Sequence, residues 1–185
     1  PCLRNRVQAK LIVRPAIAFY SPDQGAEVRF CYNRPFLDTS RRAHVKAFAE
    51  LTEREILAVA VFAEEEDSRI YLSFAEDLAK RYPESAKIFE KMAEEEKDHR
   101  HQLLEMYEQR FGPNLPPIRR EDVKGFLRRR PIWLTKNLRL DVIRKEAETM
   151  EFQAERFYIK AAEHTTDTGV RKLLGDLAEA EKSHE

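Results

Sequence analysis

Two short motifs of one kind carry the chemistry that this sequence could perform. Glu96 is followed three residues later by His99, and Glu181 is followed at the same spacing by His184. Residues three apart lie on one face of an α-helix, so each pair can present a carboxylate and an imidazole to one point. Two such pairs suggest two metal ions.

Each motif has an upstream companion. Glu64 precedes Tyr71 by seven residues, and Glu151 precedes Tyr158 by seven. The order Glu, Tyr, Glu-x-x-His therefore occurs twice, which indicates an internal repeat of a helical hairpin. The predicted ligands are Glu64, Glu96, His99, Glu151, Glu181 and His184, with Tyr71 and Tyr158 close to them.

A length of 185 residues fits one domain with some extra sequence. Its composition, with only 5 glycines, favours a mainly helical fold. A formal net charge of zero gives no general attraction to nucleic acid. Two cysteines, with no Cys-x-x-Cys, are too few for a disulfide framework or a thiolate metal site, and we expect an intracellular protein. The printed sequence has no apolar run of eighteen residues, so it predicts no membrane span.

Residues 1–43 differ from the remainder. They contain 8 basic and 3 acidic residues, whereas 44–185 contains 25 basic and 30 acidic ones. Short β-prone stretches between prolines predict a small appendage that is poorly defined or disordered. The acidic, helical part at 44–185 is the predicted functional domain.

Local signals predict where four helices begin and end. A capping box formed by Thr52 and Glu55 begins the first. Pro83 disfavours helix in the residue before it and suits the first turn of the second helix. Asp167 can cap the fourth. The predicted ranges are about 53–81, 83–111 and 140–164, with the last helix following residue 167.

Helical phase distinguishes inward from outward carboxylates. At 100° per residue, Glu64 falls in the apolar arc of its helix, whereas its neighbour Glu65 does not. The same placement puts Glu96 inside and Glu94 towards water. Asp67 is a further inward carboxylate and a weaker candidate ligand. Removing several carboxylates from water without cations is very costly, so bound cations are expected.

The donor set limits the metal. Carboxylates and imidazoles without thiolate suit iron or manganese and admit zinc. Di-iron carboxylate bundles use a Glu from each of two helices and a Glu-x-x-His from each of the other two. In that plan Glu64 and Glu151 are terminal ligands, Glu96 and Glu181 bridge the ions, and His99 and His184 bind one ion each. Tyr71 and Tyr158 could bond a ligand, act as redox-active phenols or simply pack.

The connection at 112–139 is too long for a tight turn and predicts a crossover that lets the second and third helices run parallel. A short helix is expected at about 121–128. Trp133 follows the cluster Arg128, Arg129 and Arg130. It could plug the bundle, or it could lie on an anionic membrane surface with these cations.

The stretches 63–71 and 93–99, with their repeats at 151–158 and 181–184, resemble the rubrerythrin branch of the ferritin-like superfamily over about residues 50–185. The resemblance implies an all-α, ferritin-like four-helix bundle with a long crossover between helices 2 and 3. It also implies a site with two Fe ions that reduces peroxide or oxidises Fe(II), often in a homodimer. The chain departs from classical rubrerythrins in lacking cysteines for a rubredoxin domain. Ala154 replaces an additional carboxylate, so efficient peroxidase turnover is not expected.

The stretches 119–126, 131–134 and 171–181 resemble the membrane-bound ferritin-like proteins more closely. In that family a vacuolar-iron-transporter-like domain follows, and its members export iron from bacterial cytoplasm and protect against iron and peroxide stress. The resemblance implies a cytoplasmic domain tethered to the inner membrane, and a last helix that stops in mid-pattern suggests a truncated protein. The alternatives are a free-standing peroxide reductase with an external electron donor and a non-catalytic iron-sensing or dimerisation module.

Overall fold

The structure is a computed structural model, and it describes residues 45–125 and 131–183. Three sequence-based predictions lie outside these ranges: the appendage at 1–43, the arginine cluster at 128–130 and the candidate ligand His184.

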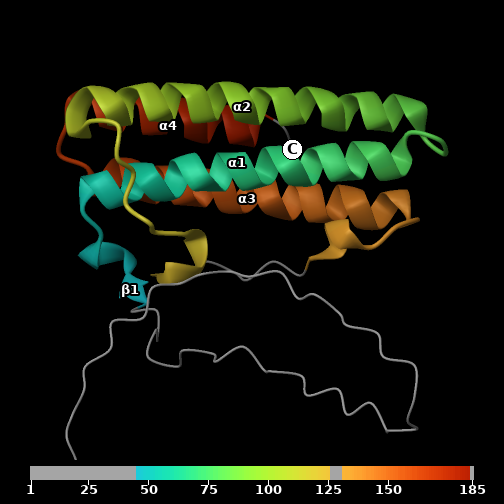
Figure 1. Ribbon diagram of the computed structural model, residues 1–185, viewed down its shortest axis with the longest axis horizontal. Helices are drawn as coiled ribbons and strands as arrows, with labels where there is room; N and C mark the ends of the chain where they lie inside the picture. Colours follow the sequence, from blue (N-terminus) through green and yellow to red (C-terminus); the bar gives the residue numbers. More distant parts are fainter. Residues whose placement is uncertain (1–44, 126–130, 184–185) are drawn as a thin grey trace, which may run out of the picture. The chain divides into compact units, whose positions relative to one another are not determined.

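Four long helices dominate the described residues (Figure 1). They are α1 (Glu53–Leu78), α2 (Pro83–Phe111), α3 (Leu140–His164) and α4 (Thr168–Lys182). α1 packs along α2, and α3 packs along α4, so each hairpin of the sequence repeat is a pair of neighbouring helices. The predicted all-α, ferritin-like four-helix bundle is confirmed.

The helix boundaries follow the local signals. The Thr52 hydroxyl accepts a hydrogen bond from the Glu55 amide, and the Glu55 carboxylate accepts one from the Thr52 amide, which completes the capping box. Asp167 Oδ1 accepts from the Val170 amide at 2.9 Å and caps α4. α1 ends at Leu78, three residues before the predicted end, because the chain turns over residues 79–81 to reach Tyr82, which has a non-helical backbone before Pro83.

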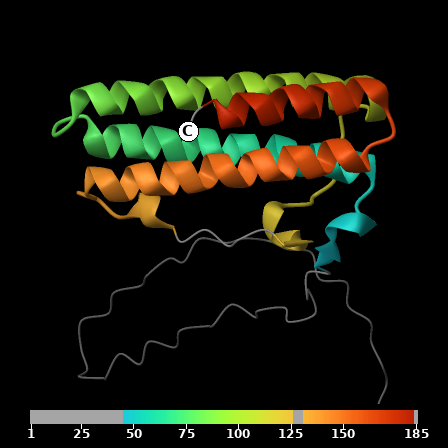
Figure 2. The same cartoon turned by 180° about the vertical axis from the view of Figure 1, so that it is seen from behind.

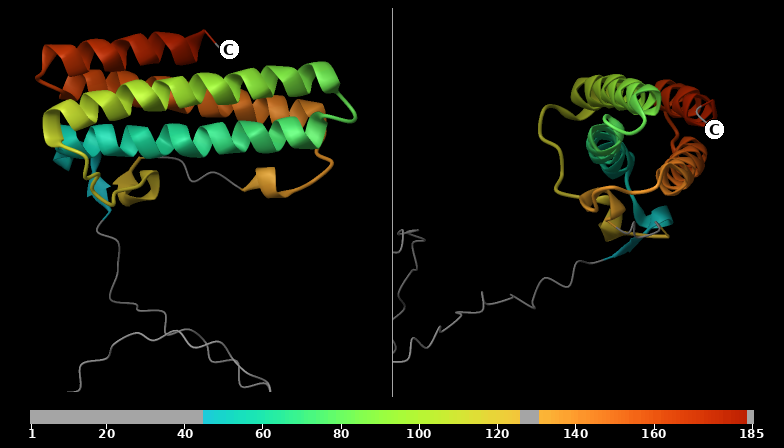
Figure 3. Two further views of the ribbon diagram at one scale, coloured as in Figure 1. Left: turned by 45° about the horizontal axis from the view of Figure 1, so that its top comes forward. Right: turned by 90° about the vertical axis from the view of Figure 1, so that its right-hand side faces the viewer.

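The helices run in the order that a crossover requires. α1 and α4 point one way along the bundle, and α2 and α3 point the other way (Figures 1 and 2). The described parts of the connection from α2 to α3, residues 112–125 and 131–139, lead to the side of the bundle formed by α1 and α3 (Figure 3). This arrangement confirms the predicted long crossover between the second and third helices.

The crossover differs from the prediction in detail. Of the helix predicted at 121–128, residues 126–128 lie outside the described ranges, and the described part is not an α-helix. It forms a single 3-10 turn, η2 (Arg120–Asp122), followed by the strand β2 (Val123–Lys124). β2 pairs in parallel with β1 (Lys46–Ala47). Val123 is 2% exposed, so burial of a β-branched side chain and a distant strand partner override the local helical pattern.

The packing alternative for Trp133 agrees with its surroundings. The residue lies in η3 (Ile132–Leu134), half-buried against the apolar cluster around Ile70 and Phe74. Its carbonyl oxygen accepts a hydrogen bond of 2.9 Å from the Ser73 hydroxyl of α1. Through this packing and this hydrogen bond, Trp133 attaches the crossover to α1.

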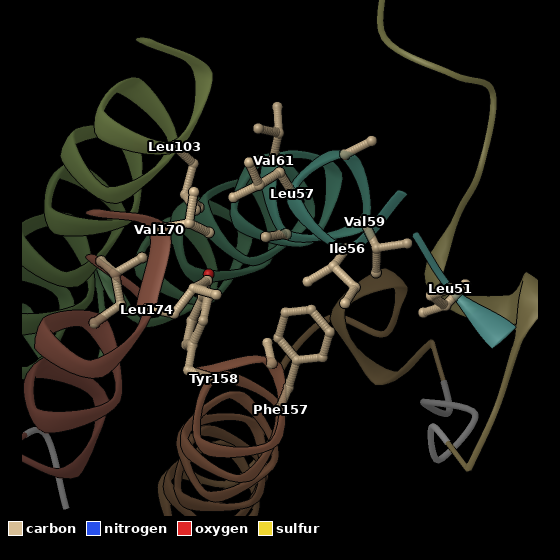
Figure 4. Close-up of a cluster of buried hydrophobic side chains, with 14 of the residues drawn as sticks. Leu51, Ile56, Leu57, Val59, Val61, Leu103, Phe157, Tyr158, Val170 and Leu174 are labelled. Carbon is tan, nitrogen blue, oxygen red and sulfur yellow. The ribbon is translucent and has the colours of Figure 1, made fainter. Parts of the chain in front are cut away.

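Two apolar clusters fill the bundle. One contains Leu57, Leu103, Tyr158 and Leu174 and is shown in Figure 4. The other is built around Phe74, Phe89 and Met150. None of the described helices combines the length and the apolarity needed to cross a bilayer.

Candidate metal centre

Four potential ligands from three helices meet between the two apolar clusters. Glu64 comes from α1, Glu96 and His99 from α2, and Glu181 from α4. Each offers one donor atom, and these four atoms all lie within 4.8 Å of one another. The side chains are buried, with exposed fractions of 1–8%. Residues more than a hundred positions apart are thus brought to one point.

The Glu-x-x-His spacing acts as predicted in α2. Nδ1 of His99 lies 3.4 Å from Oε2 of Glu96, one turn earlier on the same face. The same nitrogen lies 3.3 Å from Oε1 of Glu181 on α4, and 4.0 Å from Oε2 of Glu64. His99 therefore stands at the centre of the three carboxylates.

Glu151 lies on α3, and it is 1% exposed. It is outside the group of four atoms that converge within 4.8 Å, but its charge is close enough to raise the pKa of Glu181. Five of the six predicted ligands thus lie in one buried region, and His184 is outside the described residues. Their role as ligands stays a prediction.

The two predicted tyrosines bond the two upstream glutamates crosswise. The hydroxyl of Tyr71 on α1 donates to Oε1 of Glu151 on α3. The hydroxyl of Tyr158 on α3 donates to Oε1 of Glu64 on α1. Each tyrosine is 1% exposed, and Figure 4 shows Tyr158 directed from α3 into the bundle. Of the alternatives for these residues, bonding to a predicted ligand fits this geometry.

Asp67 has a different partner. Its Oδ2 accepts a hydrogen bond of 2.9 Å from Nη2 of Arg120, in the 3-10 turn of the crossover. Both side chains are almost buried, at 6% and 11% exposed. The role of Arg120 is not evident from the sequence, because no local pattern indicates that a loop residue fifty-three positions away will reach this carboxylate.

Burial and mutual repulsion perturb the ionisation of the cluster. Burial raises the pKa of Glu64 well above its usual value, and the charge of Glu96 raises it further. Burial also raises the pKa of Glu181 to about 9, although the nearby imidazole of His99 opposes this shift. For His99, burial lowers the pKa, but the carboxylates of Glu181 and Glu96 outweigh it and raise the value to about 10. Without a bound cation, these raised pKa values mean that protons on the glutamates and on His99 offset the negative charge of the cluster.

The buried donor atoms fit a metal ion. Among the described residues, Glu96 Oε2, His99 Nδ1 and Glu181 Oε1 are buried side-chain atoms without a hydrogen-bond partner. Buried polar groups are normally satisfied, and these three point at one another. Carboxylate oxygens and an imidazole nitrogen are the donors that iron, manganese and zinc accept. The cluster therefore has the composition, burial and unsatisfied donors of a metal site.

Comparisons with known proteins agree with this geometry. The family model described as Rubrerythrin matches residues 55–185. That range spans most of the chain and includes all six predicted ligands. No curated protein and no solved structure matches the chain. The rubrerythrin match implies iron binding, which the buried glutamates and histidine can provide. By its sequence over residues 55–185, this chain belongs to the rubrerythrin family.

Proposed function

We propose that this domain binds two Fe ions between its four helices and oxidises Fe(II). The observation that carries the proposal is the convergence of Glu96, His99 and Glu181 on one point through buried donor atoms that lack hydrogen bonds. The helices α2 and α4 hold these atoms in position before any ion binds, so little reorganisation is needed on binding.

The proposed roles follow the two halves of the repeat. Glu96 and Glu181 bridge the ions, Glu64 and Glu151 are terminal ligands, and His99 and His184 each bind one ion. Iron supplies the electrons for reduction of dioxygen or peroxide. Tyr71 and Tyr158 hold the two terminal carboxylates through their hydroxyl groups. The surrounding apolar clusters exclude bulk water and so strengthen the attraction between the carboxylates and a cation.

The proposed setting is a membrane iron exporter that protects bacterial cells against iron and peroxide stress. In this proposal the domain lies on the cytoplasmic side of the inner membrane, forms a homodimer and feeds Fe(III) to a transporter-like domain that follows it. The resemblance of 119–126, 131–134 and 171–181 to membrane-bound ferritin-like proteins supports this setting. Ala154, at a position where classical rubrerythrins have a carboxylate, favours Fe(II) oxidation over a free-standing peroxide reductase.

An anaerobic Fe(II) titration of the full chain tests the proposal. We expect two Fe(II) per chain, followed by the near-ultraviolet absorption of carboxylate-bound ferric iron when dioxygen or peroxide is added in separate samples. The matched control pair is Glu96→Gln and Glu94→Gln, because Glu94 lies two residues away on the exposed face of α2. Fewer than one Fe(II) per chain, with no oxidation, would contradict the proposal. Tight binding without oxidation would instead identify a non-catalytic iron-sensing module.

A further inference from the structure

A small cavity lies beside Glu64, lined by residues of α1, α3 and the crossover. Glu64, Arg120, Gln153, Ala154 and Tyr158 are among the residues that line it. It leaves about 10 Å³ for the centre of a water-sized molecule. That volume is close to the minimum that one buried water needs.

Two polar atoms of the residues that line the cavity are unsatisfied. Nε of Arg120 and Oε1 of Gln153 are buried and have no hydrogen-bond partner within the described parts of the chain. They are chemically complementary, because an arginine Nε–H only donates and a glutamine Oε1 only accepts. A molecule between them must therefore accept one hydrogen bond and donate another.

The charge of the cavity restricts its ligand further. The ion pair with Asp67 holds the Arg120 guanidinium in place, and that fixed positive charge disfavours a metal cation. Dioxygen has no hydrogen to donate to Gln153. A neutral hydroxylic molecule meets both requirements, and Glu64 and Tyr158 offer it further polar partners.

A larger pocket adjoins the small cavity. Arg120 and Ala63 line both the small cavity and a pocket of about 530 Å³ between α1 and the crossover. Trp133 and Glu66 are among the other residues lining that outer pocket. A ligand in the cavity is thus next to these two side chains, which also border the outer pocket.

We propose that the cavity between Arg120 and Gln153 is a binding site for a small hydroxylic molecule, water or hydrogen peroxide, held beside Glu64. Water fits the volume directly. Hydrogen peroxide has the same donor and acceptor chemistry but one more oxygen, so the lining side chains must move apart to admit it. The part concerning hydrogen peroxide rests on the proposed oxidation of Fe(II), whereas the existence of the site does not.

A crystal structure of the metal-free full chain tests the site without any activity. We expect an oxygen atom within hydrogen-bond distance of both Arg120 Nε and Gln153 Oε1. The peak should disappear in Gln153→Met, which removes the acceptor, and in Ala154→Val, which fills the cavity while leaving both polar groups. A direct bond between Arg120 and Gln153, or a peak that persists in both variants, would overturn the proposal.

Kinetics distinguishes the two molecules. If hydrogen peroxide uses the site, Gln153→Met should slow oxidation of bound Fe(II) by peroxide about tenfold or more, with the dioxygen rate and the Fe(II) stoichiometry unchanged. If both rates are unchanged while the crystallographic peak is lost, the site holds water. Gln102→Met on the exposed face of α2 is the matched control and should change neither rate. Failure of the wild-type chain to oxidise Fe(II) would count against the proposed function and leave the crystallographic result valid.

Discussion

Tyr158 donates its hydroxyl hydrogen to Glu64, a residue ninety-four positions earlier in the chain. Tyr71 makes the reciprocal bond to Glu151, eighty positions later. Each half of the sequence repeat therefore supplies a glutamate and bonds the glutamate of the other half. The two hairpins are held together at the candidate metal centre by these crossed bonds as well as by apolar packing.

Loss of the Tyr158 hydroxyl should weaken metal binding without abolishing it. In Tyr158→Phe, Glu64 keeps its place in α1 but loses the donor that orients it, and partners of this kind typically contribute 10–100-fold to metal affinity. Competition with a chelator measures the affinity. Tyr107→Phe is the control, because its buried hydroxyl bonds the carbonyl of Asn114 and not a predicted ligand. Equal effects of the two substitutions would contradict a specific role for Tyr158.

Removal of a bridging carboxylate should abolish binding of both ions. Glu96→Ala and Glu181→Ala each delete a group proposed to contact both metals, and each also removes a neighbour of His99. Iron analysis after anaerobic loading and desalting checks this expectation. A variant that retained two Fe per chain would refute the bridging assignment.

His184→Ala tests a predicted ligand that lies outside the described residues. We expect loss of mainly one ion, leaving about one Fe per chain, because the other histidine, His99, stays with the carboxylates. Two Fe bound at the wild-type affinity would count against a ligand role for His184.

The metal-free protein should lose stability as the pH rises. The pKa of Glu181 increases from 4.5 to about 9 on folding, and that of His99 from 6.5 to about 10. For each group, at a pH between its unfolded and folded pKa values, the folded state binds more protons than the unfolded state. A rising pH therefore favours unfolding. Bound cations replace the protons, so the metal-loaded protein should keep its Tm. Thermal unfolding between about pH 6 and 8, with and without Fe(II) under anaerobic conditions, measures both trends, and a constant Tm for the metal-free chain would contradict the expected coupling.

Loss of the Asp67 charge should be strongly destabilising. In Asp67→Asn the nearly buried guanidinium of Arg120 loses its ion pair, and such changes cost roughly 3–5 kcal/mol. Chemical denaturation of the metal-free chain gives the change in the free energy of unfolding. Asp176→Asn is the control, because Asp176 and Lys172 form an exposed pair whose loss costs about 0.5 kcal/mol or less. An equally small loss of unfolding free energy in Asp67→Asn would contradict the expectation and show that another group balances the charge of Arg120.

The helices and the faces that they bury follow from local patterns in the sequence. The capping residues Thr52 and Asp167 act over three or four residues, so their effect does not depend on the remainder of the chain. Helical phase places Glu64 and Glu96 inside and Glu94 outside for the same reason, because the 3.6-residue period is a property of the local backbone. The Glu-x-x-His spacing of α2 is likewise local, and its geometry agrees with the prediction.

The contacts between side chains of different helices and loops depend on how the whole chain packs. The bond from Tyr158 to Glu64, the ion pair of Arg120 with Asp67 and the pairing of Val123 with Lys46 all join residues more than fifty positions apart. At Val123 the tertiary partner also overrode a local helical pattern. Such contacts depend on how the two hairpins pack and on the path of the crossover, and no short stretch of sequence encodes that path. The fold and the inward carboxylates were therefore predictable, whereas the bonds that orient those carboxylates were not.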